Sequence, residues 1–201
     1  MILARHILDI LFPPRKTELL VRDLSYEELL SHMNIRALAQ DTVALLPYQT
    51  EAVRAVILEA KFGNSPHAQE LLGRVLGEYL LSHDLRDAVL VPIPLSKKRY
   101  RERGYNQAQR IAEHARASIP DLEIASALLA RTRNTLPQTT LGGMDRHQNV
   151  RGAFEASEII DPERTYIVLD DVITTGATLS AAVAALSKAG ARRILPLALA
   201  H

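Results

Sequence analysis

The chain has 201 residues, 47% of them hydrophobic and 23% charged, proportions typical of a folded globular protein and not of a disordered one. Its 24 Lys and Arg against 23 Asp and Glu give a formal net charge of +1, which excludes an overall basic nucleic-acid coat but leaves room for a local basic face. Cysteine is absent, which excludes disulfides, thiolate metal sites and cysteine nucleophiles within these residues.

The first 83 residues carry mainly helical patterns. Residues 1–12 are apolar but interrupted by charges, which favours a helix packed on its own domain over a membrane anchor or a signal peptide. A capping box that starts at Ser25 predicts a short helix through about Met33. Apolar residues at helical spacing predict a further helix from Pro47 and a longer one that begins near Ala68. No segment reaches the roughly 20 apolar residues of a membrane span, so we expect a cytoplasmic protein that makes no membrane contact.

Strand and helix patterns alternate from residue 88 onwards. We expect strands over 88–94, 128–130, 150–156, 166–169 and 194–200, with helices from Asn106 and over 177–188. Residues 97–103 read as a basic loop, and 132–149 as a long loop without secondary structure. This alternation predicts an α/β fold with a mostly parallel sheet flanked by helices. We therefore divide the chain into a helical N-terminal extension, 1–46, and an α/β domain, 47–201.

The strongest chemical signal lies between the predicted strand at 166–169 and the predicted helix at 177–188. Asp170 and Asp171 follow the strand, and the small residues 174–178 form the turn into the helix. Backbone amides and hydroxyls at the start of a helix bind phosphate groups well, whereas two carboxylates can accept hydrogen bonds from a diol. The combination indicates a site for a ribose 5-phosphate, although two acids at such a position can also simply cap the turn.

The segment Tyr166–Thr178 resembles the motif with which type I phosphoribosyltransferases bind 5-phosphoribosyl 1-diphosphate (PRPP). The resemblance implies a type I phosphoribosyltransferase fold, in which Asp170 and Asp171 belong to the catalytic centre and hold the ribose hydroxyls. The residues that would wrap the 5-phosphate are Thr174, Thr175, Gly176, Ala177 and Thr178. It also implies Mg²⁺ as the cofactor, held mainly by PRPP oxygens and water, with the two aspartates as the nearest candidate protein ligands.

Further motifs resemble the ComF/GntX-type branch of phosphoribosyltransferase-like proteins, and the whole match covers about residues 47–201. These motifs lie at Val91–Leu95, at Arg103–Gln107 and between Arg131 and Phe154. The substrate contacts that they imply are Pro92, Pro94, Arg103, Asn106, Gln107, Arg131, Gln138, Arg146 and Asn149. Members of this branch often begin with a four-cysteine zinc finger. Because this chain has no cysteine, we expect no such finger in it and helix packing around residues 1–46 instead.

The predicted loop at 97–103 would supply positive charge to the site. Its cationic residues are Lys97, Lys98, Arg99, Arg101 and Arg103. Such a group suits a diphosphate or a nucleic-acid backbone, although a solvated basic loop is the alternative for each residue. In the fold that the sequence resembles, the loop at 132–149 is a hood that closes over the substrate and excludes water, which competes with transfer.

Two functional hypotheses follow from these observations. The first is a Mg-dependent enzyme that transfers the 5-phosphoribosyl group of PRPP to an unknown, base-like nitrogenous acceptor and releases diphosphate. The second is a non-catalytic protein that binds PRPP or a nucleotide, or that handles single-stranded DNA beside a helicase in competence and DNA uptake. The sequence leaves the acceptor and the oligomeric state open, and a dimer is compatible with it.

Overall fold

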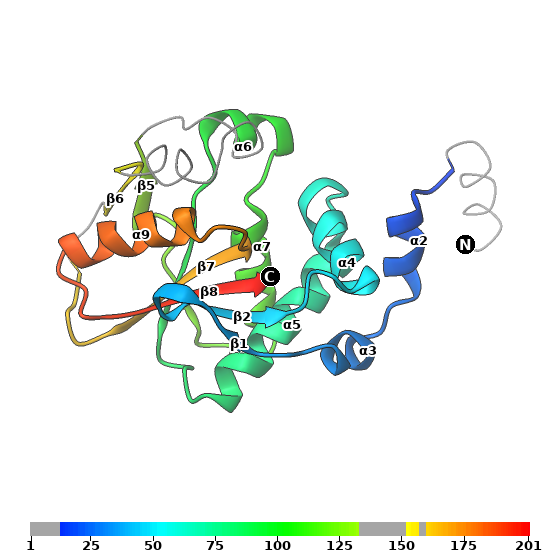
Figure 1. The fold of residues 1–201 in the computed structure, drawn as a ribbon, viewed down its shortest axis with the longest axis horizontal. Coiled ribbons are helices and arrows are strands. Elements are labelled where there is room, and N and C mark those ends of the chain that lie inside the picture. The colour runs from blue at the N-terminus through cyan, green and yellow to red at the C-terminus, as the bar shows by residue number, and fades with distance from the viewer. Residues whose placement is uncertain (1–12, 133–151, 157–159) are drawn as a thin grey trace.

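The computed structural model describes residues 13–132, 152–156 and 160–201, and its centre is a six-stranded sheet with the order β1-β2-β8-β7-β3-β4 (Figure 1). The strands of this sheet are β1 (Arg36–Ala37), β2 (Val43–Leu46), β3 (Val89–Pro92), β4 (Glu123–Ile124), β7 (Thr165–Val172) and β8 (Arg193–Ala200). Neighbouring strands run parallel, except that β1 is antiparallel to β2. A separate antiparallel pair consists of β5 (Leu129–Arg131) and β6 (Phe154–Ala156).

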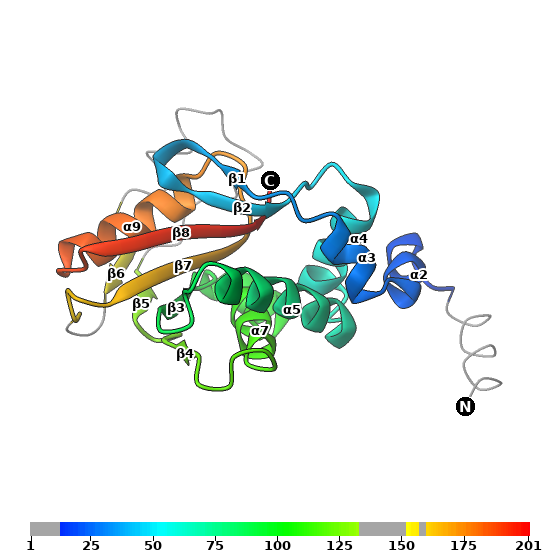
Figure 2. The same cartoon turned by 90° about the horizontal axis from the view of Figure 1, so that it is seen from below.

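Helices cover both faces of the sheet. They are α2 (Lys16–Asp23), α3 (Tyr26–Ser31), α4 (Glu51–Phe62), α5 (Pro66–Ser82), α6 (Lys97–Arg103), α7 (Gln107–Ala115) and α9 (Ala177–Lys188), with a 3₁₀ turn at Ala39–Asp41. Helix α9 packs against β7 and β8 on one face, whereas α5 and α7 pack together on the other (Figure 2). This mostly parallel, helix-flanked sheet confirms the predicted fold class and is consistent with a type I phosphoribosyltransferase-like fold. Within the described residues, no helix is both long enough and apolar enough to cross a membrane.

Strand β7 lies inside the sheet and is apolar on both sides because helices cover both of its faces. Ile167 and Leu169 belong to the core beneath α4, α5 and α7, and Tyr166 and Val168 belong to the core beneath α9. Side chains alternate between the two faces of a strand. The alternation therefore directs the next residues, Asp170 and Asp171, toward opposite faces of the sheet.

The strand register brings the carboxyl ends of the inner strands to one edge. Val172 of β7 pairs with Ala200 of β8, and Leu46 of β2 pairs with the same residue. Beyond the pairing of Pro92 with Leu169, the amide of Ile93 donates a hydrogen bond to the Leu169 carbonyl at 2.9 Å. Loops that leave these strands therefore meet at the edge where ligands bind in α/β folds.

Several predicted elements are confirmed. Ser25 caps α3 by accepting a hydrogen bond from the amide of Glu28 at 3.1 Å. The second long helix of the N-terminal half is α5, which has 17 residues, and α9 has the predicted bounds. The helix expected over 1–12 lies outside the described residues.

Strands β1 and β2 and helix α6 differ from the sequence prediction. Strands β1 and β2 lie in a segment for which the sequence predicts helices. A short apolar run such as Val43–Leu46 is compatible with either a helix or a strand, and its pairing with β8 makes it a strand. Residues 97–103 form helix α6 instead of a loop. Ser96 caps its start, and Gly104, with a φ of 78°, ends it in the left-handed conformation that favours glycine. The division at residues 46 and 47 remains a prediction.

Candidate functional site

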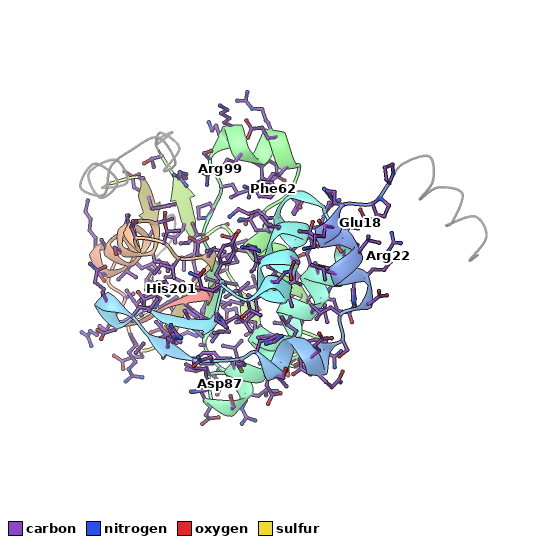
Figure 3. The ribbon with its side chains drawn as sticks, turned by 45° about the vertical axis from the view of Figure 1, so that its right-hand side comes forward. Glu18, Arg22, Phe62, Asp87, Arg99 and His201 are labelled. Carbon is purple, nitrogen blue, oxygen red and sulfur yellow. The ribbon has the colours of Figure 1, made fainter. Side chains whose placement is uncertain are left out.

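A cavity of about 1010 Å³ opens at the carboxyl edge of the sheet. Its walls come from the end of α4, the segment from Ile93 to α6, the end of β7 and the turn into α9. Figure 3 labels three of the lining residues, Phe62 of α4, Arg99 of α6 and His201 after β8. The volume is at the upper end of the range for small-molecule sites, and it lies where the parallel sheet predicts a ligand.

The turn between β7 and α9 has the properties of an anion site. Gly176 precedes the helix with a φ of 74°, and a Cβ there would also meet the Ile173 Cδ1 atom at 3.4 Å. The first amides of the 12-residue helix α9 have no partner within the helix, and residues 174–178 at its start line the cavity. The Thr175 hydroxyl oxygen is buried and finds no hydrogen-bond partner within the described parts of the chain. A phosphate oxygen in the cavity would accept hydrogen bonds from amides at the start of the helix.

Asp171 is 4% exposed and is held by groups from three elements. Its Oδ2 atom lies 2.8 Å from Lys61 Nζ of α4 and accepts a hydrogen bond from Gln107 Nε2 of α7 at 3.0 Å. Its Oδ1 atom accepts a hydrogen bond from the amide of Val172 at 2.8 Å. Burial raises the pKa of Asp171, but the charge of Lys61 and these hydrogen bonds outweigh burial and lower the pKa overall. Asp171 is therefore an ionised carboxylate tied into the fold.

Asp170 has a different environment. The amide of Asp171 donates to its Oδ1 atom at 2.9 Å, and the part of the chain that the structure describes provides no ion-pair partner for it. Burial and the neighbouring charge of Asp171 raise the pKa of Asp170 to about 7. Because Asp170 lines the cavity, a ligand hydroxyl or cation that approaches it would relieve this uncompensated charge.

Of the predicted contacts Arg103, Asn106 and Gln107, only Gln107 lines the cavity, and the other two contact its wall from outside. Arg103 donates a hydrogen bond from Nη1 to the Oε1 atom of Gln107 at 2.8 Å, and Gln107 in turn holds Asp171. Asn106 caps α7 by accepting from the amide of Ala108 and donates from Nδ2 to the Ile93 carbonyl at 3.0 Å. Arg103 and Asn106 do not line the cavity themselves, so they support the site from behind.

Besides Lys61, three cationic side chains of the described residues line the cavity. Lys98 and Arg99 come from α6, and Arg131 comes from β5, with its guanidinium 5.2 Å from the centre of the Phe154 ring. Burial and the charge of Arg99 lower the pKa of Arg131, whereas the negative charge of Asp170 raises it. The cavity therefore combines an anion-binding turn, a carboxylate pair and a set of cations on its walls.

The structure brings most of the predicted site residues into this one cavity. Those that line it are Asp170, Asp171, Thr174, Thr175, Gly176, Ala177, Thr178, Pro94, Gln107 and Arg131. Pro92 is buried within β3 and does not reach the cavity. Gln138, Arg146 and Asn149 lie outside the described residues.

Sequence reasoning missed a group of lining residues on the α4 side. They are Tyr48, Gln49, Lys61, Phe62 and His201. No local motif marks Lys61, because a lysine in the last turn of a helix is common on protein surfaces. Its single informative contact is with Asp171, 110 residues later in the chain, and only the fold creates that contact.

The described residues contain no group of three or more His, Asp or Glu that could hold a metal ion. Only one carboxylate of the pair, Asp170, is free of a cationic partner within the described chain. This donor set does not make a protein-only metal cage. It would fit a Mg²⁺ ion that is coordinated mainly by water and by the phosphates of a ligand.

Comparison with known proteins adds an independent observation. No protein-family model matches the chain. The chain is 30% identical to competence protein F of Haemophilus influenzae over 163 residues, which cover 77% of this chain and 70% of that protein. It is 30% identical to the DNA utilization protein YhgH of Escherichia coli K12 over 105 residues, or 52% of this chain and 45% of that protein. The similarity to the protein of the same name from Shigella flexneri is 29% over the same length.

Proposed function

The chain belongs to the family of competence protein F, and from this premise we propose that it binds Mg-PRPP and transfers the 5-phosphoribosyl group to a nitrogenous acceptor. The observation that carries the proposal is the edge of the sheet at which one cavity joins the phosphate-type turn at 174–178 to the pair Asp170 and Asp171. A phosphorylated ribose has a phosphate at one end and a diol beside its reactive carbon, so it matches both features at once.

The proposed reaction replaces one bond at ribose C1 by another. The bond between C1 and the diphosphate oxygen breaks, a bond from C1 to the acceptor nitrogen forms, and the proton of that nitrogen passes to water. The transition state carries positive charge on the ribose ring, and the negative charge of Asp170 would stabilise it. Lys98, Arg99 and Arg131 would stabilise the leaving diphosphate. Mg²⁺ bound with PRPP would neutralise further diphosphate charge.

A role with DNA is the second candidate function. Two relatives carry names that refer to DNA utilization, and one carries a name that refers to competence. The observation that favours this role is α6, on which Lys97, Lys98, Arg99 and Arg101 are all exposed and of which Lys98 and Arg99 line the cavity. We propose that in this case the chain takes part in DNA uptake and binds a single strand through α6, with an affinity that falls steeply as the salt concentration rises.

The experiment that separates the candidates measures diphosphate release and DNA binding on the same preparation. The chain is incubated with Mg-PRPP and a panel of purine and pyrimidine bases, and calorimetry measures Mg-PRPP affinity in parallel. We expect acceptor-dependent release of diphosphate, and we expect Asp170→Asn with Asp171→Asn to abolish PRPP binding. If PRPP binds but diphosphate release does not exceed the rate of hydrolysis, the proposal of a transferase is wrong. Unchanged Mg-PRPP affinity in the double variant would show that the site is wrongly assigned.

A titration with fluorescent single-stranded DNA at several salt concentrations tests the second candidate. Lys97→Ala with Arg101→Ala is the informative variant, because Arg101 and Lys97 lie on α6 but do not line the cavity. We expect this variant to lose DNA affinity and to keep PRPP affinity. DNA binding that is unaffected by the variant or by salt would contradict a role of α6.

A further inference from the structure

The side chain of Phe62 is exposed to solvent, although an apolar ring is more stable when it is buried. Phe62 is the last residue of α4 and is 61% exposed, the highest value among the large hydrophobic side chains that the structure describes. It lines the cavity beside Tyr48, Ile57 and Leu58. An exposed aromatic ring in the wall of a concave site marks a surface that a ligand can cover.

The guanidinium of Arg103 lies over the Phe62 ring. The guanidinium carbon of Arg103 lies 4.8 Å from the centre of the Phe62 ring, in the geometry of a cation–π contact. Arg103 is fixed in turn by its hydrogen bond to Gln107 at 2.8 Å. Because Arg103 does not line the cavity and Phe62 does, the guanidinium covers one face of the ring and the cavity retains access to the side chain. A ring that is already oriented loses little conformational freedom when a second planar group stacks on it.

Phe62 and the carboxylate pair line the same cavity. Lys61 precedes Phe62 and contacts Asp171 at 2.8 Å. The backbone of α4 at Lys61 and Phe62 therefore lies at the edge of the cavity that contains the end of β7. The turn at 174–178 lies on the α9 side of the same cavity, whereas Phe62 belongs to the α4 side. A ligand whose phosphate occupied the turn would have to extend across the cavity to reach the α4 wall.

We propose that Phe62, backed by Arg103, is a stacking platform for a planar nitrogenous ring attached to C1 of the ribose that the cavity binds. The inference rests on the proposed ribose-phosphate site and adds the residue that recognises the ring. It assigns the α4 wall, and not the phosphate turn or the basic helix α6, to the base. Stacking on an aromatic side chain is tolerant of base identity, so the platform accepts purines and pyrimidines and favours the larger ring.

Nucleoside 5′-monophosphates test this without knowledge of the acceptor. Calorimetry measures the affinities of AMP, GMP, CMP and UMP and compares each with the affinity of ribose 5-phosphate. The ratio of the two affinities isolates the contribution of the base. We expect AMP or GMP to bind about tenfold more tightly than ribose 5-phosphate. Phe62→Ala is expected to remove most of that gain and to leave the affinity for ribose 5-phosphate unchanged, and Phe62→Tyr is expected to keep the gain.

Tyr100→Ala is the matched control, because Tyr100 is an aromatic residue that is 54% exposed on α6 and does not line the cavity. The control is expected to keep the full gain. The inference is wrong if no nucleotide binds more tightly than ribose 5-phosphate, if the gain survives in Phe62→Ala, or if Tyr100→Ala removes it equally. Failure of ribose 5-phosphate itself to bind would instead overturn the proposed function, and the inference with it. Thermal unfolding of each variant confirms that it is folded.

Discussion

At the end of β7, two adjacent carboxylates lie on opposite faces of the sheet and have different environments. On the α4 and α7 face, Asp171 is bonded to Lys61, Gln107 and the amide of Val172. On the α9 face, Asp170 accepts one backbone hydrogen bond, carries a raised pKa of about 7 and lines the cavity without a cationic partner among the described residues. Two residues that look equivalent in the sequence therefore have different environments.

The difference indicates a division between support and binding. Asp171 ties α4 and α7 to β7, and Gln107 extends this support to Arg103. Asp170 is the carboxylate left to contact a ligand. The resemblance to phosphoribosyltransferases implied that both aspartates hold ribose hydroxyls, and the contacts of the structure favour Asp170 as the principal one.

The largest expected effect comes from changing each carboxylate singly. Asp170→Asn removes the charge that faces the cavity, so we expect Mg-PRPP affinity to fall about 100-fold, which corresponds to about 3 kcal/mol. Asp171→Asn removes a charge already neutralised by Lys61, so we expect a smaller loss of affinity together with a lower melting temperature. Calorimetry and thermal unfolding measure both quantities. Equal losses of affinity in the two variants would contradict the division of tasks.

Replacement of Lys61 tests the supported side. Lys61→Met leaves the buried charge of Asp171 without its cation, and we expect the free energy of unfolding to fall by about 3 kcal/mol in urea denaturation. Adding Asp171→Asn to this variant is expected to recover part of that loss, because the buried charge is then gone. Lys16→Met is the matched control, since the ion pair of Lys16 with Glu51 is exposed, and it should change stability little. Similar losses in the two lysine variants would rule out a special role for Lys61.

The pH dependence of stability tests the open side. The pKa of Asp170 is about 7 in the folded chain, above the value of about 4 for an unfolded aspartate. Between these values the folded state holds the extra proton, so the contribution of Asp170 to stability falls as the pH rises from about 4 to about 7. Over this pH range we expect the free energy of unfolding of the unmodified chain to fall by about 2 kcal/mol more than that of Asp170→Asn. This is less than the full pKa shift would give, because Asp170 is partly exposed. Parallel curves for the two proteins would show that Asp170 is not perturbed.

Gly176→Ala gives the smallest effect and tests the turn. The φ of 74° at Gly176 disfavours any other residue, and we expect a loss of about 1 kcal/mol in stability. Gly190→Ala is the control, because Gly190 also has a positive φ, of 110°, but lies after α9, at the end away from the cavity, and a Cβ there meets nothing within 4 Å. Ribose 5-phosphate affinity should decrease in Gly176→Ala only. A similar decrease in both variants would mean that the turn does not hold the phosphate.

Much of the binding side could be predicted from the sequence, because its residues are contiguous. The segment from Tyr166 to Thr178 contains the strand, the two acids and the turn, and α9 has the predicted bounds. The supporting side could not be predicted, because its contacts join residues that are distant in the chain. Lys61 has no local signal, and Gln107 was predicted to contact substrate but also holds Asp171.

The prediction of α6 as a loop has a local cause. Five cations in seven residues repel one another, which favours a loop by composition, but the capping residues Ser96 and Gly104 were present in the sequence and outweigh that repulsion. Strand β2 has no such local signal, because its identity depends on β8. Local signals therefore account for the elements around the phosphate turn, and long-range pairing accounts for the rest of the sheet.

The most direct test of the account is a crystal structure of the chain with Mg-PRPP or ribose 5-phosphate bound. We expect the 5-phosphate on the amides of the turn at 174–178, the ribose hydroxyls on Asp170, and Lys61 still paired with Asp171. A ligand held only by α6, or a ribose bound by Asp171 with Lys61 displaced and Asp170 not in contact, would contradict it.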